Sequence, residues 1–79
     1  MNNFYVYCHK DSDGKIRYFG KGRNKRAWDF TKRNPYWKNV FKNTPPTVEI
    51  LVDHLSESAA FELEKFFIAE AKADGVQLC

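Results

Sequence analysis

One glutamate, Glu64, carries a charge in a stretch of sequence where its neighbours are apolar. Residues Ser56 to Lys72 have the pattern of a helix, in which side chains three and four positions apart share a face. The neighbours of Glu64 at those spacings are Ala60, Phe61, Phe67 and Ile68. A carboxylate there costs stability unless a cation, a metal ion or a hydrogen bond compensates. Glu64 is therefore a candidate metal ligand, and the ordinary alternatives are a buried ion pair or a helix edge that reaches solvent.

Two tyrosines lie on a predicted β-hairpin. Residues Phe4 to His9 alternate as a strand, with Tyr7 on the same face as its neighbours two positions away. Asp11 to Gly14 form a turn cluster, after which Lys15 to Phe19 resume the β pattern. A four-residue loop predicts a register that places Tyr7 opposite Tyr18. Cross-strand packing is the common role of such a pair, and proton transfer by a phenol is the chemical alternative.

Positive charge is concentrated in the first half of the chain. Residues 1–45 contain eleven Lys or Arg and three Asp, whereas residues 46–79 contain two Lys and seven acids. Aromatic residues interleave with the cations, which is typical of a protein that binds a phosphate backbone. A solvated basic face is the alternative. The candidate phosphate contacts are Arg17, Arg23, Lys25 and Arg33.

The length and composition limit the class of protein. A chain of 79 residues supports one small domain. No apolar run approaches the roughly 20 residues that a membrane span needs, and no secretory signal pattern is present. Cys8 and Cys79 form a poor disulfide framework, and together with His9 and His54 they lack the spacing of a zinc site. These features favour a reduced, intracellular, cytoplasmic protein.

The remaining segments predict two more helices and a third strand. The first helix is expected from about Asn24 to Lys32, and a second from Asn34-Pro35 to about Lys42, where prolines follow. Val48 to Val52 alternate as a strand, and Ser56 is the expected N-cap of the last helix. The predicted class is α+β, with a small three-stranded antiparallel sheet packed with helices in the order β-β-α-α-β-α.

Three short motifs follow one another along the chain. Tyr5-Val6-Tyr7 and Tyr18-Phe19-Gly20 are tyrosine triplets on the two strands of the hairpin. The second triplet continues through a basic, glycine-containing loop to Ala27. Leu55 to Lys65 then read LSESAAFELEK. In order and spacing these motifs resemble the GIY-YIG nuclease family, and the resemblance spans nearly the whole chain as a single domain, residues 1–79.

The resemblance implies a mechanism and assigns roles to residues. Residues Tyr18 to Ala27 are similar to the subgroup written YIGKGxxxRA, which makes Arg26 the family arginine, and the metal-binding glutamate falls on Glu64. The implied reaction is a one-metal hydrolysis that leaves a 5′-phosphate and a 3′-hydroxyl. Tyr7 would be the general base and Tyr18 would position water or phosphate. Lys21 and Arg26 would bind the phosphate and lower the pKa of Tyr7.

The same resemblance implies cofactors and partners. Glu64 would hold Mg²⁺ or Mn²⁺, with no small-molecule cofactor. The expected partner is DNA, with RNA as an open alternative, and no membrane. A domain that keeps the basic surface but has lost catalysis is the competing class. A third class is an interaction domain whose acidic second half docks a partner.

Two departures from the family pattern bear on these roles. The family often has histidine or tyrosine four residues after the arginine, where this chain has Phe30. A phenyl ring cannot relay a proton, and His9, on the same strand face as Tyr7, is the candidate replacement. The family also places an asparagine shortly after the last helix. This chain ends at Cys79 near that point, as expected for a truncated polypeptide or a minimal member.

Overall fold

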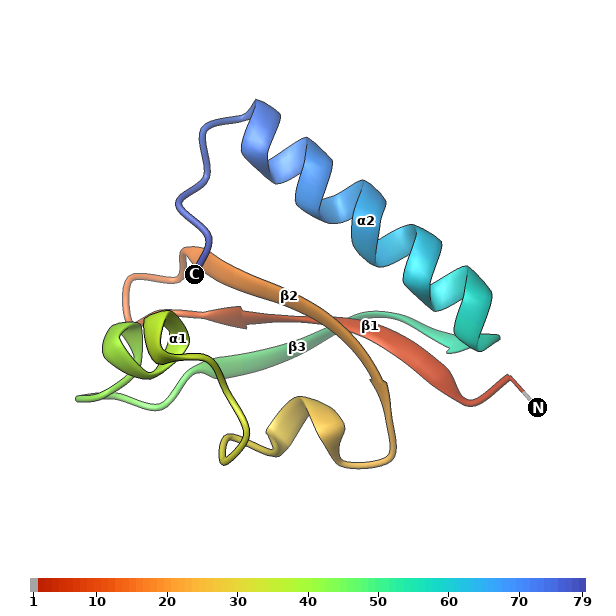
Figure 1. The fold of residues 1–79 in the computed structure, drawn as a ribbon, viewed down its shortest axis with the longest axis horizontal. Helices are drawn as coiled ribbons and strands as arrows, with labels where there is room; N and C mark the ends of the chain where they lie inside the picture. The colour runs from red at the N-terminus through yellow and green to blue at the C-terminus, as the bar shows by residue number, and fades with distance from the viewer. Residues whose placement is uncertain (1) are drawn as a thin grey trace.

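The computed structural model describes residues 2–79, which form a three-stranded antiparallel sheet with helices (Figure 1). The strand order is β2-β1-β3, so β1 is central and β2 has a free edge. The predicted α+β class and the antiparallel sheet are confirmed. The elements in chain order are β1 (Phe4–Lys10), β2 (Ile16–Arg23), the 3₁₀ turn η1 (Arg26–Trp28), α1 (Pro35–Val40), β3 (Thr47–Leu55) and α2 (Glu57–Ala73).

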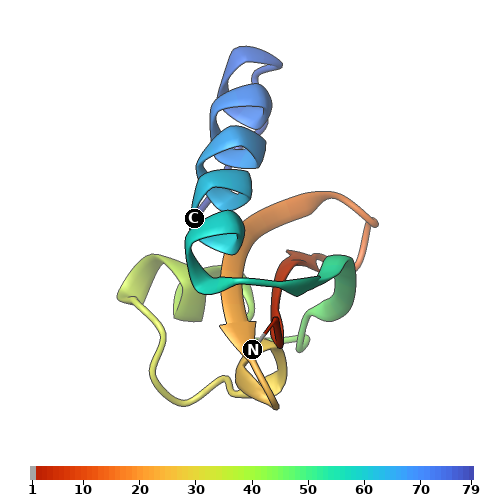
Figure 2. The same ribbon diagram turned by 90° about the vertical axis from the view of Figure 1, so that its right-hand side faces the viewer.

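The sheet separates two helical layers. Helix α2 crosses one face, while η1 and α1 lie against the other (Figures 1 and 2). The alternation of β1 explains both contacts, because Tyr7 packs with Ala27 of η1 and Cys8 packs with Ala71 of α2. Among the described residues, no helix is long and apolar enough to cross a membrane.

Both predicted N-caps are present. The Ser56 hydroxyl accepts a hydrogen bond of 3.2 Å from the Ala59 N–H at the start of α2. The Asn34 side chain accepts one of 2.7 Å from the Trp37 N–H, with proline at the first position of α1. These local signals placed the starts of both helices correctly.

The helix expected from Asn24 to Lys32 is wrong. Only the three residues of η1 are helical, and residues 29–34 connect η1 to α1 without regular structure. The reason is a side chain that competes for backbone acceptors. Arg33 donates to the carbonyls of Arg26 and Asp29, each at 3.0 Å, which a continuing helix would have used.

The predicted hairpin register is also wrong. Tyr7 pairs with Gly20, and Tyr18 pairs with His9, with a register shift next to Lys10. The turn is longer than expected because the Asp11 carboxylate accepts hydrogen bonds from the N–H groups of residues 13 and 15. A slip of two residues preserves the side-chain faces. The Tyr7 and Tyr18 rings therefore remain on one face, with centroids 6.3 Å apart.

Candidate functional site

Tyr7 lies at the centre of a buried aromatic cluster and is covered by an arginine. Its side chain is 1% exposed, and Arg33 Nη1 donates a hydrogen bond of 2.9 Å to its hydroxyl. The guanidinium also lies over the rings of Tyr7, Tyr18 and Trp37, at 5.6, 5.3 and 5.8 Å from their centroids. Cations over aromatic rings are stabilising, most of all where water is excluded.

Arg33 therefore has a different position from the one expected for it. It was predicted as a phosphate contact, but it is 7% exposed. Two of its hydrogen bonds go to carbonyls within residues 26–33, and the third, to Tyr7, joins this segment to the sheet. No local pattern in the sequence indicates this role, because the acceptors are two backbone carbonyls and a distant phenol. The one feature of the sequence that bears on this role is the position of Arg33 directly before the Asn34-Pro35 helix start.

The environment of Tyr7 raises its pKa. Burial raises the pKa above the ordinary value of 10.0, and the hydrogen bond and charge of Arg33 oppose this only in part. Arg26 contributes a smaller lowering. Arg26 thus acts in the expected direction, but Lys21 is not among the groups that shift the pKa of Tyr7, and burial makes the net change a rise. The cation in contact with Tyr7 is Arg33, and Lys21 pairs with Glu57 of α2, across the sheet, at 3.4 Å.

Gly20 is required by the position of the Tyr7 ring. A Cβ atom at residue 20 would lie 2.5 Å from the Cζ and Oη atoms of Tyr7. The two residues are paired across β1 and β2, and the phenol occupies the space that a side chain at residue 20 would need. The glycine of the second tyrosine triplet thus has a packing role that the structure makes visible.

His9 is buried in the same cluster, and both of its ring nitrogens are engaged. Nδ1 is 3.0 Å from the Trp37 Nε1–H, which can only donate, so Nδ1 accepts. Nε2 therefore carries the proton and donates to the Ala27 carbonyl at 2.7 Å. Burial lowers the pKa of His9 to about 4. His9 packs against Tyr7 and Phe30, but as a neutral core residue it has no free nitrogen with which to replace the missing proton relay.

This buried histidine predicts a loss of stability in mild acid. The unfolded chain binds a proton at His9 near pH 6.5 and the folded domain only near pH 4, so stability falls as pH decreases through that interval. The expected loss is about 3 kcal/mol. Urea unfolding at about pH 7 and about pH 4.5 measures it. His9→Gln should flatten the dependence, and His54→Gln, at a site 87% exposed, should not. Equal slopes for His9→Gln and the unaltered chain would contradict this account.

Glu64 lies on the face of α2 that packs against the free edge of β2. Its carboxyl is partly buried, and burial raises its pKa, opposed by the charge and the backbone N–H of Lys21. Within residues 2–79 it forms no ion pair of 4.0 Å or less, since Lys21 Nζ bonds Glu57 instead. A direct ion pair therefore does not explain its unusual position within the described residues, whereas the backbone N–H and the charge of Lys21 offset part of the cost of burial.

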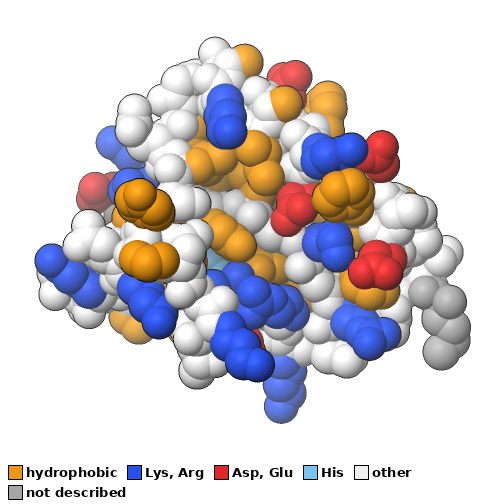
Figure 3. All heavy atoms as spheres, viewed as in Figure 1, with side chains coloured by type: hydrophobic (Ala, Val, Ile, Leu, Met, Phe, Trp, Pro, Cys, Tyr) orange, Lys and Arg blue, Asp and Glu red, His pale blue; other side chains and the backbone are white. Residues whose placement is uncertain are grey.

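Tyr18 and Glu64 meet at a cleft of about 400 Å³. Tyr18 belongs to the edge strand β2 and Glu64 to α2, so the cleft lies between these two elements and the C-terminal residues Leu78 and Cys79. Figure 1 shows α2 next to β2. Figure 3 shows hydrophobic side chains exposed between charged ones on this side of the molecule. The lining residues are Tyr18, Phe19, Glu64, Ile68, Lys72, Leu78 and Cys79.

The predicted site residues do not all share this cleft. Tyr7 and Arg33 lie behind Tyr18, on the η1 side of the sheet, whereas Lys21 and Glu64 lie on the α2 side. Arg26 is half-buried above Gly22, where a Cβ would meet its own Cβ at 2.6 Å. Tyr18 is near both groups, because its ring packs beside Tyr7 and it also lines the cleft with Glu64.

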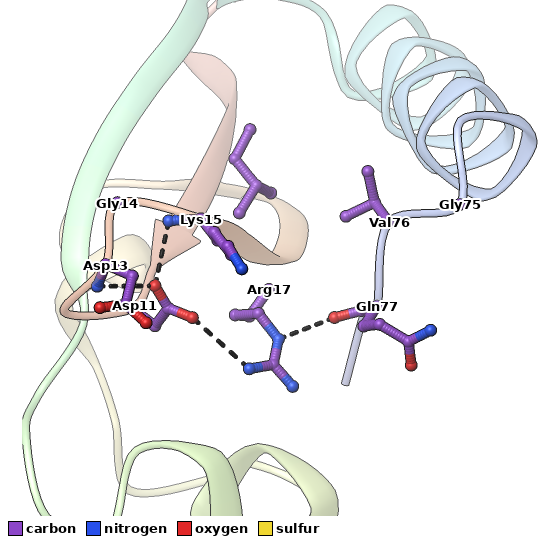
Figure 4. A pocket seen from close by; sticks show the side chains of 9 residues that line it. Asp11, Asp13, Gly14, Lys15, Arg17, Gly75, Val76 and Gln77 are labelled. Carbon is purple, nitrogen blue, oxygen red and sulfur yellow. Dashed lines mark hydrogen bonds and ion pairs between the residues drawn. The ribbon is translucent and has the colours of Figure 1, made fainter.

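The candidate phosphate contacts also divide. Arg23 and Lys25 are exposed, as expected. Arg17 is instead tied to the chain itself, with Nε donating to the Gln77 carbonyl at 2.7 Å and Nη1 3.5 Å from the Asp11 carboxylate. It lines a separate hollow of about 730 Å³ between the hairpin loop and the C-terminal segment (Figure 4). These interactions position the C-terminal segment rather than leaving a free cation.

The donor set at Glu64 fits magnesium better than zinc. Residues 2–79 contain no group of three or more His, Cys, Asp or Glu that could hold one metal ion. Mg²⁺ usually takes only one or two carboxylates and completes its shell with water and phosphate oxygens, so a single accessible carboxylate suffices. Zinc requires three or four protein ligands, and Cys8 and His9 face opposite sides of the sheet.

No protein-family model, curated protein or solved structure matches this chain. The geometry itself defines the class of protein. It is a small α+β domain with an acidic residue and a tyrosine at an edge cleft, backed by a buried arginine–tyrosine pair and flanked by exposed cations.

Proposed function

We propose that this domain is a metal-dependent endonuclease that hydrolyses DNA phosphodiester bonds in the manner of the GIY-YIG nucleases. The observation that supports it most is that Tyr18 and Glu64 line one cleft although 46 positions of sequence numbering separate them. A phosphodiester nuclease needs a metal ligand, a group that positions water and cations that hold the phosphate. This cleft and its surroundings offer all three.

Each side chain has a role in this proposal that follows from its position. Glu64 holds Mg²⁺ or Mn²⁺, and the bound ion supplies Lewis-acid stabilisation of the phosphate charge. Tyr18 orients the attacking water or a phosphate oxygen with its hydroxyl. Lys21 and Arg26 attract the phosphate, and charge-assisted hydrogen bonds strengthen as negative charge develops on it.

Tyr7 is the proposed general base, and its surroundings set a condition on that role. Arg33 donates to its hydroxyl and covers it, so Tyr7 reaches water only when the Arg33 side chain moves aside. The guanidinium stabilises the phenolate form, whereas burial destabilises it more strongly. A base with a raised pKa is mostly protonated at neutral pH, which predicts slow catalysis.

The burial of Tyr7 favours a second candidate, a nucleic-acid-binding module without catalysis. In that case the Arg33–Tyr7 pair only stabilises the fold, and the exposed cations hold DNA or RNA phosphates without cleavage. The two candidate functions share the basic surface and differ in whether the cleft catalyses phosphodiester hydrolysis.

A plasmid-nicking assay with Mg²⁺ separates these candidates. The nuclease should be slow near neutral pH, and its rate should rise towards pH 10 as the phenolate fraction of Tyr7 grows. Tyr7→Phe should remove the rise, which corresponds to a rate loss of roughly 10²–10⁴ at alkaline pH, and should retain DNA binding. Phe66→Ala, at a residue of α2 that is 56% exposed and does not line the cleft, is the control.

Two outcomes would count against this role of Tyr7. A rate independent of pH that survives Tyr7→Phe would assign the base to another group. Salt-sensitive binding with no nicking at any pH, with either Mg²⁺ or Mn²⁺, would favour the binding module.

A further inference from the structure

Two large aromatic side chains outside the cleft are left in solvent. Trp28 of η1 is 52% exposed and Tyr36 of α1 is 77% exposed. Among the aromatic rings of residues 2–79, Trp28 contacts that of Tyr5 alone, edge-on, with centroids 6.3 Å apart. Tyr36 has no aromatic neighbour among the described residues. Both residues belong to the helical layer of η1 and α1, on the face of the sheet opposite α2 (Figures 1 and 2). The core therefore does not account for either side chain.

The surroundings of these two aromatics are strongly basic. Residues 23–42 contain a single acid, Asp29, whose carboxylate is engaged by the N–H and hydroxyl of Thr31 at 3.1 and 2.6 Å. Lys and Arg side chains gather over this layer in Figure 3. The exposed cations of the segment are Arg23, Lys25, Lys32, Lys38 and Lys42.

Exposed aromatics elsewhere on the molecule have a different setting. Phe66 of α2 is 56% exposed, and Phe61 is 47% exposed. They lie on an acidic helix, and Lys65, the cation over the Phe61 ring, is paired with Glu62. Within residues 2–79, exposed aromatic side chains coincide with unpaired positive charge only in the segment 23–42. That combination matches a polyanion whose units carry flat, apolar faces.

We propose that residues 23–42 form a platform for single-stranded nucleic acid, in which unpaired bases stack on Trp28 and Tyr36 while the surrounding cations hold the phosphates. A duplex hides its base faces in the helical stack, so the two aromatics add affinity only for unpaired bases. Stacking is indifferent to base identity, and the platform therefore selects strand state rather than sequence. This inference rests on the proposed function for nucleic-acid binding and does not depend on cleavage.

The experiment compares two strands of equal charge. An oligothymidylate and an abasic deoxyribose-phosphate strand of the same length are titrated into the full chain, with affinity measured by anisotropy. The thymidylate should bind about tenfold or more tightly than the abasic strand. Trp28→Ala and Tyr36→Ala should each lower thymidylate affinity about tenfold and leave abasic affinity unchanged. Phe66→Ala, an exposed aromatic on α2, should change neither.

Intrinsic fluorescence gives a second readout. The chain has two tryptophans, and Trp37 is buried and bonded to His9, so quenching by a stacked base reports mainly on Trp28. Trp28→Phe should abolish most of the quenching while keeping most of the affinity, since phenylalanine also stacks.

The outcomes distinguish this inference from the proposed function. Equal affinity for the two strands, or variants that weaken both equally, would show that only charge binds and would overturn the platform, while nuclease activity could stand. A preference for the thymidylate strand without any nicking would support the platform and contradict the proposed nuclease activity. No binding to either strand, or binding only to an acidic polypeptide such as polyglutamate, would overturn both the platform and nucleic-acid binding.

Discussion

Glu64→Gln is expected to lower Mg²⁺-dependent cleavage by about a hundredfold or more and to leave the domain folded. The carboxylate lines the cleft with Tyr18 and has no ion pair among the described residues, so the substitution removes the side chain that would hold the metal ion in the proposed function. The charge stabilisation that a bound metal ion supplies is worth several kcal/mol, which corresponds to such a loss. Glu62→Gln is the matched control, because that side chain is 66% exposed and pairs with Lys65.

The same substitution has a predicted effect on stability that is independent of activity. Burial raises the pKa of Glu64 above its ordinary value of 4.5, so the ionised form destabilises the fold at neutral pH. Glu64→Gln should therefore melt at the same temperature as the unaltered domain or higher near pH 7. The difference should disappear below about pH 4.5, where the carboxyl is protonated in both states.

These two measurements decide the role of Glu64 together. Equal activity losses in the Glu64 and Glu62 variants would remove the metal-ligand assignment. A large drop in melting temperature for Glu64→Gln alone would show that the carboxylate is structural, because its raised pKa predicts that the ionised form destabilises the metal-free fold.

Arg33→Met is expected to cost about 3 kcal/mol of unfolding free energy. The substitution leaves the Tyr7 hydroxyl and the Asp29 carbonyl without the Arg33 donor, while the Arg26 carbonyl keeps the Asp29 N–H at 3.2 Å, and each unpaired buried group costs roughly 1–3 kcal/mol. Partial hydration of the loop offsets some of that sum. A small domain has only about 5–15 kcal/mol in total, so the loss is large.

Urea unfolding measures this cost, and two further variants define it. Lys32→Met, at the exposed neighbouring position, should lie within about 0.5 kcal/mol of the unaltered chain. Arg33→Lys should recover little, because a single ammonium cannot reproduce the planar fork that reaches three acceptors. The pKa of Tyr7 should rise further in Arg33→Met, as followed by ultraviolet titration. Near-native stability of Arg33→Met would mean that the buried guanidinium is not what holds residues 26–33 against the sheet.

Much of the fold could be predicted because its signals are local. The alternation of β1 and β3 and the caps at Asn34 and Ser56 each depend on a few neighbouring residues, and each appears in the structure. The apolar surroundings of Glu64 in α2 likewise predicted a partly buried carboxyl, which is what the structure contains.

The errors occurred where a distant side chain competes with a local preference. The helix expected after Asn24 is cut to η1 because Arg33 takes its carbonyls. The hairpin register moved by two residues: the turn held by Asp11 is longer by one residue, and an irregularity between His9 and Lys10 adds the second. Neither set of hydrogen bonds could be predicted from the spacing of residues in the sequence.

The sequence by itself determined the class of fold, the faces of the strands and the unusual setting of Glu64, because periodicity and capping act over a few residues. Only the tertiary structure decided which cation meets Tyr7, that His9 is neutral and that Tyr18 and Glu64 share a cleft. Those contacts join residues far apart in the chain. Their geometry and pKa values depend on burial that exists only once the sheet and both helical layers have packed together.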